Sequence, residues 1–365
     1  MRYSSLWRNV WALTIFNFLA GLSSAAFYTI FPLFLEDLGH SLSEIGFIVS
    51  LASLIGSANL PLAGALVDSV GRKFVVFLSG LMLAIPLAVP LLTHEFLPLA
   101  LGYALYYISY FIWSPASSSL LVDSIDPRNL GKGFSIISLG YPLASAVSPY
   151  LSGLMVEIYG YWFSFFVFLM ISVLGILSFL TLAVETLRVK SSLSEALFES
   201  YKMAFRPPKV LRWIYPYTFV DHMAWMTWWP ILSVYFSDIY GLTPSGIGLL
   251  ITISYVVQAL TLPVAGKLTD EIGPIKMMIS GNIAGLMFMA LFPSLRGMEE
   301  LLVVSMVALG LSASLWMPSF YSAVAMLSGA ENRGKVYGSV NSLCLLASAP
   351  APFIGSYLYS SIGVI

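Results

Sequence analysis

Long apolar segments alternate with short polar ones along the whole chain. Each apolar segment is close to the roughly 20 residues that a helix needs to cross a bilayer. Strands of a membrane barrel would be shorter and would alternate apolar and polar positions, so the pattern predicts membrane-spanning helices. We expect eleven spans, near residues 10–35, 45–67, 74–93, 97–122, 133–156, 162–184, 213–236, 246–267, 276–294, 301–327 and 336–360.

Residues 61–73 and 263–275 are two copies of one pattern, 202 residues apart. The first copy is PLAGALVDSVGRK and the second is PVAGKLTDEIGPI, and each follows an apolar segment. Such a repeat is typical of transporters built from two related halves. We therefore predict an all-α membrane protein of two six-helix bundles, over residues 1–184 and 213–365, joined by a polar linker over 185–212.

The repeat also bears on the end of the chain. Trp113 and Pro115 recur as Trp316 and Pro318, 203 residues later. The same offset aligns Ile365 with the start of the sixth span of the first half. We therefore expect five spans in the second half and a missing twelfth helix, and a shortened chain is favoured over a native protein of eleven helices.

Composition agrees with a membrane protein. The chain is 58% hydrophobic and only 10% charged, and its mean hydropathy is +0.87. Soluble domains carry about 25% charged residues. The net charge of −1 does not favour a nucleic-acid partner, and the single cysteine, Cys344, excludes an intrachain disulfide and a cysteine metal site. We expect no metal and no cofactor.

Charge also orients the spans. All but one of the 17 Lys and Arg residues fall on the side of the N-terminus, and Arg296 is the exception. Because cytoplasmic loops are enriched in Lys and Arg, we predict a multi-pass protein of the cell membrane with a cytoplasmic N-terminus.

Over its whole length the chain resembles the major facilitator superfamily. The loop between helices 2 and 3 of that family is matched by Gly64, Leu66, Asp68, Gly71, Arg72 and Lys73. The second copy keeps Gly266, Leu268, Asp270 and Gly273 but lacks the Arg-Lys pair. The resemblance implies a monomeric secondary transporter that rocks between inward-open and outward-open states, and it implies that these loops control the gate.

Three roles for the loop stay open. Asp68 and Arg72 are four residues apart, within ion-pair reach if the helix continues. Asp68 could instead interact with the positive N-terminus of a helix from the other half. The Gly-Arg-Lys sequence could also serve only to anchor a cytoplasmic turn.

The resemblance favours export over import. Proton-driven exporters of this family carry an Arg in helix 4, and residues 103–113 contain none, which weakens proton antiport. Their glycine-rich helix 5 pattern is matched in part by Ser148, Pro149, Ser152 and Gly153. Because residues 351–356 repeat this pattern in the other half, it could instead serve close helix packing.

Asp221 is the strongest candidate for a functional residue. It lies nine residues beyond Arg212, about 13 Å along a helix, and so near the middle of a core about 30 Å thick. An intramembrane acid usually faces a cavity or a partner. Asp221 shares one helix face with Trp225 and Trp228, so it could bind an organic cation or carry a coupling proton, and His222 could titrate beside it. A structural hydrogen bond to another helix is the alternative.

Other polar and aromatic residues are candidates for the same cavity. Each could instead serve helix packing or the membrane interface. The scarcity of charge favours a small apolar or amphipathic solute, neutral or cationic, with H⁺ and membrane lipid as further partners. The candidates are Asn17, Tyr106, Tyr110, Trp113, Gln258, Trp316 and Asn341.

Other functions fit the sequence less well. The three histidines are scattered and no catalytic grouping or P-loop spacing is present, so we do not expect an enzyme. A membrane sensor would not need paired gating loops. An importer or uniporter of a neutral metabolite such as a sugar, or a lipid or lysolipid flippase of the same fold, remains an alternative to proton-coupled efflux.

Overall fold

The computed structural model describes residues 7–126, 129–187, 192–194, 197–198, 214–328 and 343–362. Most of the predicted linker over 185–212 and the candidate site residue Asn341 lie outside the described residues. The side chains of nine further residues are not described: Leu60, Pro61, Asp68, Leu130, Gly131, Lys132, Ala325, Leu327 and Ser328.

The described part of the chain is almost entirely helical. The first half, residues 7–187, contains α1 (Trp7–Asp37), α2 (Leu42–Ala58), α3 (Leu60–Ser69), α4 (Arg72–Leu92), α5 (Phe96–Ser124), α6 (Leu130–Ser138), α7 (Gly140–Ser145) and α8 (Ser148–Leu182). The second half, residues 214–362, contains α10 (Ile214–Trp228), η3 (Trp229–Ile231), α11 (Leu232–Tyr240), α12 (Pro244–Ile272), α13 (Pro274–Ser294), η4 (Glu299–Leu301), α14 (Leu302–Ser328) and α16 (Ala351–Ile362).

The predicted spans correspond to these helices. Among the described residues, eight helical stretches are long and apolar enough to cross a membrane by themselves. One of them, Gly133–Leu182, covers two predicted spans, which meet at Gly160. Three predicted spans are broken into shorter helices: 45–67 into α2 and α3, 133–156 into α6, α7 and the start of α8, and 213–236 into α10, η3 and α11.

Two of the breaks lie at residues that interrupt a helix. Gly160 has a φ of 82°, a conformation that glycine adopts without steric cost, and this turn lets α8 reverse its course. Pro230 lies in the short 3-10 helix η3, where its missing N–H costs little at the start of a helix. At these two positions the chain bends where it loses a backbone donor or gains left-handed freedom, whereas the breaks at Asn59 and Leu139 occur at residues with right-handed helical dihedral angles.

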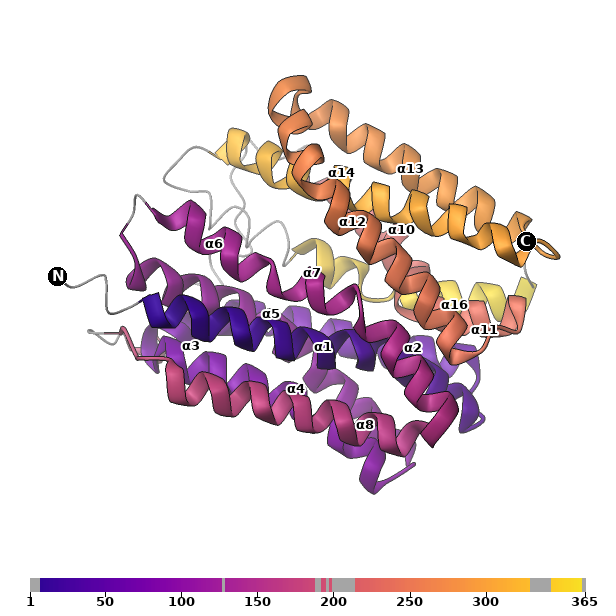
Figure 1. Cartoon of the computed structure of the whole chain (residues 1–365), viewed down its shortest axis with the longest axis horizontal. Coiled ribbons are helices and arrows are strands. Elements are labelled where there is room, and N and C mark those ends of the chain that lie inside the picture. The colour runs from indigo at the N-terminus through magenta and orange to yellow at the C-terminus, as the bar shows by residue number, and fades with distance from the viewer. Residues whose placement is uncertain are drawn as a thin grey trace.

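The two ends of the helix bundle differ in charge. We call the end that carries Arg8, Arg72, Lys73, Lys267 and Lys276 the basic end. The opposite end, which we call the acidic end, carries Glu36, Asp37, Glu95, Glu157, Asp238 and Glu299. In Figure 1, with the basic end at the left, α11 and α16 of the second half lie beside α1 and α2 at the right.

The apolar cores show where the halves join. One buried cluster contains residues of both halves, such as Phe31 and Ile48 of the first with Ile231 and Ile251 of the second, and it lies toward the acidic end. Two further clusters lie toward the basic end, and each draws its described residues from one half only. Among the described residues, the halves are therefore packed together at the acidic end and have separate cores at the basic end.

Glycines allow the closest contacts between the halves. A Cβ on Gly153 of α8 would lie 2.1 Å from the carbonyl oxygen of Pro244, at the start of α12. A Cβ on Gly248 of α12 would lie 2.2 Å from the carbonyl oxygen of Pro149. A Cβ on Gly46 of α2 would meet Pro352 and Ser356. The small residues of the predicted helix 5 pattern thus bring two backbones together, as the packing interpretation proposes.

Gly153→Ala is expected to disturb this end. Because the added methyl group would meet backbone atoms, α8 and α12 must separate, and the population with an open acidic end should increase. Distances between spin labels at positions 95 and 300 would report the change after replacement of the one free cysteine, Cys344. Gly266→Ala on α12 is the control, because a Cβ at that position would meet nothing within 4 Å. Identical distance distributions in both variants would refute the expectation.

Candidate functional site

Asp221 lies in a polar cluster inside the second half. It is 9% exposed, and the side chain of Asn282 on α13 is within hydrogen-bonding reach of its carboxylate. Asn282 donates a hydrogen bond of 3.0 Å to the Tyr217 hydroxyl, and Trp316 Nε1 donates one of 2.9 Å to the same oxygen. Three helices, α10, α13 and α14, therefore supply the cluster.

His222 is the one titratable side chain beside Asp221 in this cluster that can become positive. Its Nδ1 lies 4.0 Å from Asp221 Oδ2 and 2.9 Å from the Thr218 carbonyl oxygen. A neutral ring that donates from Nδ1 to this carbonyl leaves Nε2 as its acceptor. No described Lys or Arg side chain forms an ion pair with Asp221, so among the described residues its negative charge would be balanced by a protonated His222, by a proton or by a ligand.

The tryptophans near Asp221 pack toward α13. The rings of Trp225 and Trp228 lie 5.0 Å apart, and Trp228 lies 4.8 Å from Phe288. A Cβ on Gly285 would lie 3.6 Å from Trp225. The predicted face of Asp221, Trp225 and Trp228 is therefore directed at one neighbouring helix of the same half, and Trp228 is buried at 8% exposure.

A second aromatic group lies between the halves. Tyr28 of α1 stacks on Trp229 of η3 with ring centroids 5.9 Å apart. Trp229 lies 6.5 Å from Tyr255 of α12, and Tyr255 lies 6.5 Å from Tyr141 of α7. Tyr106, a predicted candidate, shares a hydrogen bond of 3.0 Å with Ser24 of α1. This group lies between the halves, and it adjoins the Asp221 face because Trp229 lies 6.5 Å from Trp225 and 5.9 Å from Trp228.

The remaining candidates are scattered. Asn17 Nδ2 donates a hydrogen bond of 2.8 Å to the Ile137 carbonyl oxygen, and the ring of Trp113 stacks on Phe16 with centroids 5.0 Å apart. Both residues therefore contribute to packing within the first half. Gln258 is half-buried, and its backbone carbonyl oxygen accepts a hydrogen bond from the Thr261 hydroxyl. Tyr110 is 62% exposed. The structure thus brings the Asp221 face and the aromatic group between the halves together at Trp229. Tyr110 lies within electrostatic range of Tyr141 in that group, whereas Asn17, Trp113 and Gln258 lie apart from it.

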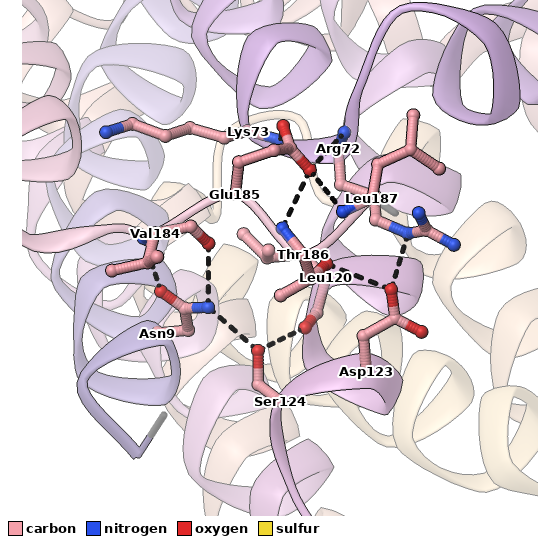
Figure 2. A network of polar contacts seen from close by, with 10 residues as sticks. All are labelled: Asn9, Arg72, Lys73, Leu120, Asp123, Ser124, Val184, Glu185, Thr186 and Leu187. Atoms are coloured by element: carbon pink, nitrogen blue, oxygen red, sulfur yellow. Dashed lines mark hydrogen bonds and ion pairs between the residues drawn. The ribbon is translucent and has the colours of Figure 1, made fainter. Parts of the chain in front are cut away.

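The first gating loop joins three segments of the first half at the basic end (Figure 2). Helix α3 ends at Ser69 and α4 begins at Arg72, so the helix does not continue from Asp68 to Arg72, and the condition for their four-residue ion pair is not met. The side chain of Asp68 is outside the described set. Arg72 Nε instead lies 2.7 Å from Asp123 Oδ2 at the end of α5.

Glu185 caps the start of α4. Its carboxylate accepts the backbone N–H groups of Arg72 at 3.1 Å and Lys73 at 2.9 Å, which are free donors at a helix N-terminus. Gly71 has a φ of 134°, and a Cβ there would lie 2.7 Å from Glu185 Oε2. Glycine at this position therefore makes room for the cap. Thr186 Oγ1 donates 2.9 Å to Asp123 and so connects the cap to the ion pair.

Asn9 of α1 hydrogen-bonds to residues beside the Arg72–Asp123–Glu185 network. Its Nδ2 donates to Ser124 at 2.8 Å and to the Val184 carbonyl at 3.0 Å, and its Oδ1 accepts the Val184 N–H at 2.7 Å (Figure 2). The sequence pattern does not predict Asp123, Glu185 or Asn9 as site residues. Asp123 follows directly after the predicted span 97–122, at the end of the bundle where basic residues gather. An acidic residue in that place is a sequence feature that could have indicated a partner for Arg72.

The stability of this corner should depend on pH. Partial burial alone would raise the pKa of Glu185, but the backbone N–H groups of Leu187, Lys73, Thr186 and Arg72 outweigh it and the pKa is lowered. A lowered folded-state pKa stabilises the protein above the ordinary value of about 4.3, and this contribution is lost as the pH falls through the folded-state value. The Glu185→Gln variant should therefore be less stable than the unmodified protein at pH 7. It should also lose less stability than the unmodified protein when the pH is lowered.

Thermal unfolding in detergent between about pH 7 and pH 3, a window chosen to bracket the ordinary Glu pKa, measures this difference. The control is Glu300→Gln, an exposed carboxyl at the acidic end. Parallel pH profiles for Glu185→Gln and the unmodified protein would contradict the expected role.

The second gating loop repeats the turn, and no comparable network is present among its described residues. Gly273, with a φ of 99°, separates α12 from α13 as Gly71 separates α3 from α4. Asp270 is exposed, and Lys267 pairs with Glu271 at 3.7 Å on the surface, with side chains 77% and 56% exposed. Gly266 has open space around it. In this copy, which lacks the Arg-Lys pair, the described ion pair is an exposed one on the surface, whereas the Arg72–Asp123 pair of the first loop is mostly shielded from water.

Two cavities lie between the halves at the acidic end. One of about 510 Å³ is lined by Glu36, His40, Asp238, Arg296 and Tyr359, among others. The other, of about 400 Å³, shares Glu36. In the first, Tyr359 donates 2.5 Å to Asp238.

The family model of the Major Facilitator Superfamily matches residues 13–220 and 214–365. The multidrug resistance protein MdtG of Citrobacter koseri is 23% identical over 368 aligned positions, covering 98% of this chain and 89% of that protein. MdtG of Dickeya zeae is 24% identical over 356 positions, covering 93% and 86%.

Solved transporters share the fold. The nucleoside transporter NupG, solved as a mutant, superposes with a TM-score of 0.77 at 15% identity, covering 98% of this chain and 93% of that chain. A bacterial homologue of the human lysosomal transporter Spinster, described as inward-facing and unoccupied, gives a TM-score of 0.72 at 15% identity, covering 98% and 83%. At these identities the likeness concerns the fold alone.

Proposed function

This chain belongs to the major facilitator superfamily, and from that premise we propose that it exports a small apolar or amphipathic solute, neutral or cationic, in exchange for protons. The protein acts as a monomer in the cell membrane and alternates between two states, each open at one end. Its similarity to proteins named for multidrug resistance, at 23% identity over 98% of the chain, supports export.

The orientation follows from charge. The basic end faces the cytoplasm, because Lys and Arg are retained on that side of a membrane. The described packing, with the halves joined at the acidic end, is then the state that receives solute from inside the cell. The first gating loop acts with Arg72 and Asp123 to hold the basic ends of α3, α4 and α5 together during the movement.

One observation carries the proton-coupling proposal: Asp221 is buried within a span beside Asn282 and His222, and no described Lys or Arg pairs with it. An acid in such a place is expected to take up and release a proton, because its charged form is costly there unless a partner arrives. Because the cluster lies within the second half, the proton and the solute need not share one position.

Reconstituted vesicles test the proposal. The protein is inserted into vesicles that contain a pH-sensitive dye, and lipophilic cations, neutral aromatic compounds, sugars and lysolipids are added in turn. Proton movement driven by lipophilic cations or neutral aromatic compounds supports coupled export. Equilibration of a labelled solute without proton movement would replace the exchanger with a uniporter, and a response to lysolipids alone would favour a flippase.

A further inference from the structure

Two buried tyrosine hydroxyls have no hydrogen-bond partner among the described residues. They belong to Tyr28 of α1 and Tyr103 of α5, and Tyr103 is fully buried. A buried donor without a partner destabilises the folded protein, because the hydroxyl gives up its hydrogen bonds to water, and phenylalanine would fill the same space without that cost. The chain uses Phe at 24 positions, so two unpaired hydroxyls at one place need an explanation.

Tyr103 is the first of four tyrosines along α5. We call Tyr103, Tyr106, Tyr107 and Tyr110 the tyrosine ladder, and neighbouring rings in it lie 5.6–5.9 Å apart from Tyr103 to Tyr107. Exposure increases along it toward the basic end, from 0% at Tyr103 and 8% at Tyr106 to 62% at Tyr110. The ladder therefore leads from the open part of the space between the halves to a buried, unpaired hydroxyl.

Tyr28 lies beside the deep end of the ladder. Tyr107, Tyr103, Tyr255 and Tyr106 are within electrostatic range of its hydroxyl. Its ring stacks on Trp229 of the other half, so the group is built from both halves. On the acidic side the shared apolar core, which includes Phe27 and Phe31 against Tyr103, closes it off.

The described aromatic residues around Tyr28 and the tyrosine ladder carry no charged side chain. The side chains in electrostatic contact with Tyr28, Tyr103, Tyr107 and Tyr110 are other tyrosines. An anionic group placed here would lack a positive partner among the described residues, and a buried unpaired charge is unstable. Phenolic hydroxyls that lack a partner can donate to a neutral oxygen, and the surrounding rings suit an aromatic or planar molecule.

We propose that Tyr28 and Tyr103 form a substrate subsite that donates hydrogen bonds to a neutral acceptor oxygen (an ether, carbonyl or hydroxyl) on an aromatic solute. The subsite selects among solutes by this oxygen, separately from any charge sensed at Asp221. This inference rests on the proposed transport function and narrows its substrate class.

Matched ligand pairs test the subsite. A methoxyphenyl alkylamine is compared with its ethylphenyl analogue, and methoxynaphthalene with ethylnaphthalene, by calorimetric titration of the full chain in detergent. The oxygen-bearing member of each pair should bind about five- to tenfold more tightly, as expected for one or two hydrogen bonds. Tyr28→Phe and Tyr103→Phe should each reduce this preference, and the double variant should remove it.

Two exposed tyrosines outside the tyrosine ladder provide controls. Tyr159 and Tyr357 are 63% and 55% exposed, and their replacement by Phe should leave the preference unchanged. Because no protein hydrogen bond is lost, Tyr28→Phe and Tyr103→Phe should unfold at the same temperature as the unmodified protein or above it. An equal affinity for both members in every pair, or a preference that survives the double variant, overturns the proposal.

Two further outcomes separate causes of failure. A lowered unfolding temperature with an unchanged ligand preference means that the hydroxyls bind structural water only, and the subsite is rejected. Loss of the preference in the Phe variants, in a protein whose Asp221→Asn form still moves protons, supports the subsite while rejecting the coupling role of Asp221.

Discussion

Asp221→Asn is expected to abolish solute-driven proton movement while leaving the protein folded. The carboxyl is buried in the span beside Asn282 and His222, and an amide of the same shape can no longer take up or release a proton. Proton movement should decrease by at least about a hundredfold, the lower end of what a positioned proton-transfer group contributes. The measurement is the rate of the internal pH change in vesicles after addition of solute.

Exchange of labelled for unlabelled solute across the same vesicles should persist, because it needs no net proton transfer. Glu300→Gln, the same chemical change at an exposed acidic-end position, should behave like the unmodified protein. Proton movement at the normal rate in Asp221→Asn would assign the residue a purely structural role.

Arg72→Ala is expected to reduce both stability and transport. The guanidinium side chain is only 16% exposed, and its removal leaves Asp123 without its cation near the carboxylate of Glu185. An exposed ion pair contributes about 0–1 kcal/mol, and because this pair is mostly shielded from water we expect a loss at the upper end of that range. Thermal unfolding and vesicle transport measure the two effects.

The second gating loop supplies the matched control. Lys267→Ala removes a cation from a surface pair, and exposed pairs contribute only about 0–1 kcal/mol, so little change is expected. The exchange Arg72→Asp with Asp123→Arg should recover part of the lost stability if the pair itself is responsible. Equal stability of Arg72→Ala and Lys267→Ala would show that the Arg72–Asp123 contact contributes little.

The sequence predicts the spans well because membrane thickness fixes the length of an apolar helix. It does not predict where spans break. Pro230 marks a break, whereas Pro86 and Pro115 lie inside continuous helices. Tertiary contacts decide between these outcomes, since neighbouring helices can satisfy the backbone groups that a proline leaves free.

The candidate site shows the same limit. Depth along a helix places Asp221 inside the membrane, but periodicity alone does not say which neighbour its face meets. That face packs toward α13 within one half, and the partner Asn282 lies 61 residues further along the chain. Similarly, the ion pair of Arg72 depends on the end of α3 at Ser69, which redirects the side chain to α5. The spacing of four residues between Asp68 and Arg72 predicts an ion pair only if one helix continues through both residues.

The glycine contacts at Gly46, Gly153 and Gly248 have a consequence for the apparent affinity at each end of the protein. They favour one member of a two-state equilibrium before any solute binds, so we expect the protein with an open acidic end to be the minor species. A solute arriving at that end meets only the competent fraction, and its apparent dissociation constant is the intrinsic value divided by that fraction. At a population of about 1% the apparent affinity there would be about a hundredfold weaker. We therefore expect rectification: the same binding residues capture solute readily from one compartment and poorly from the other.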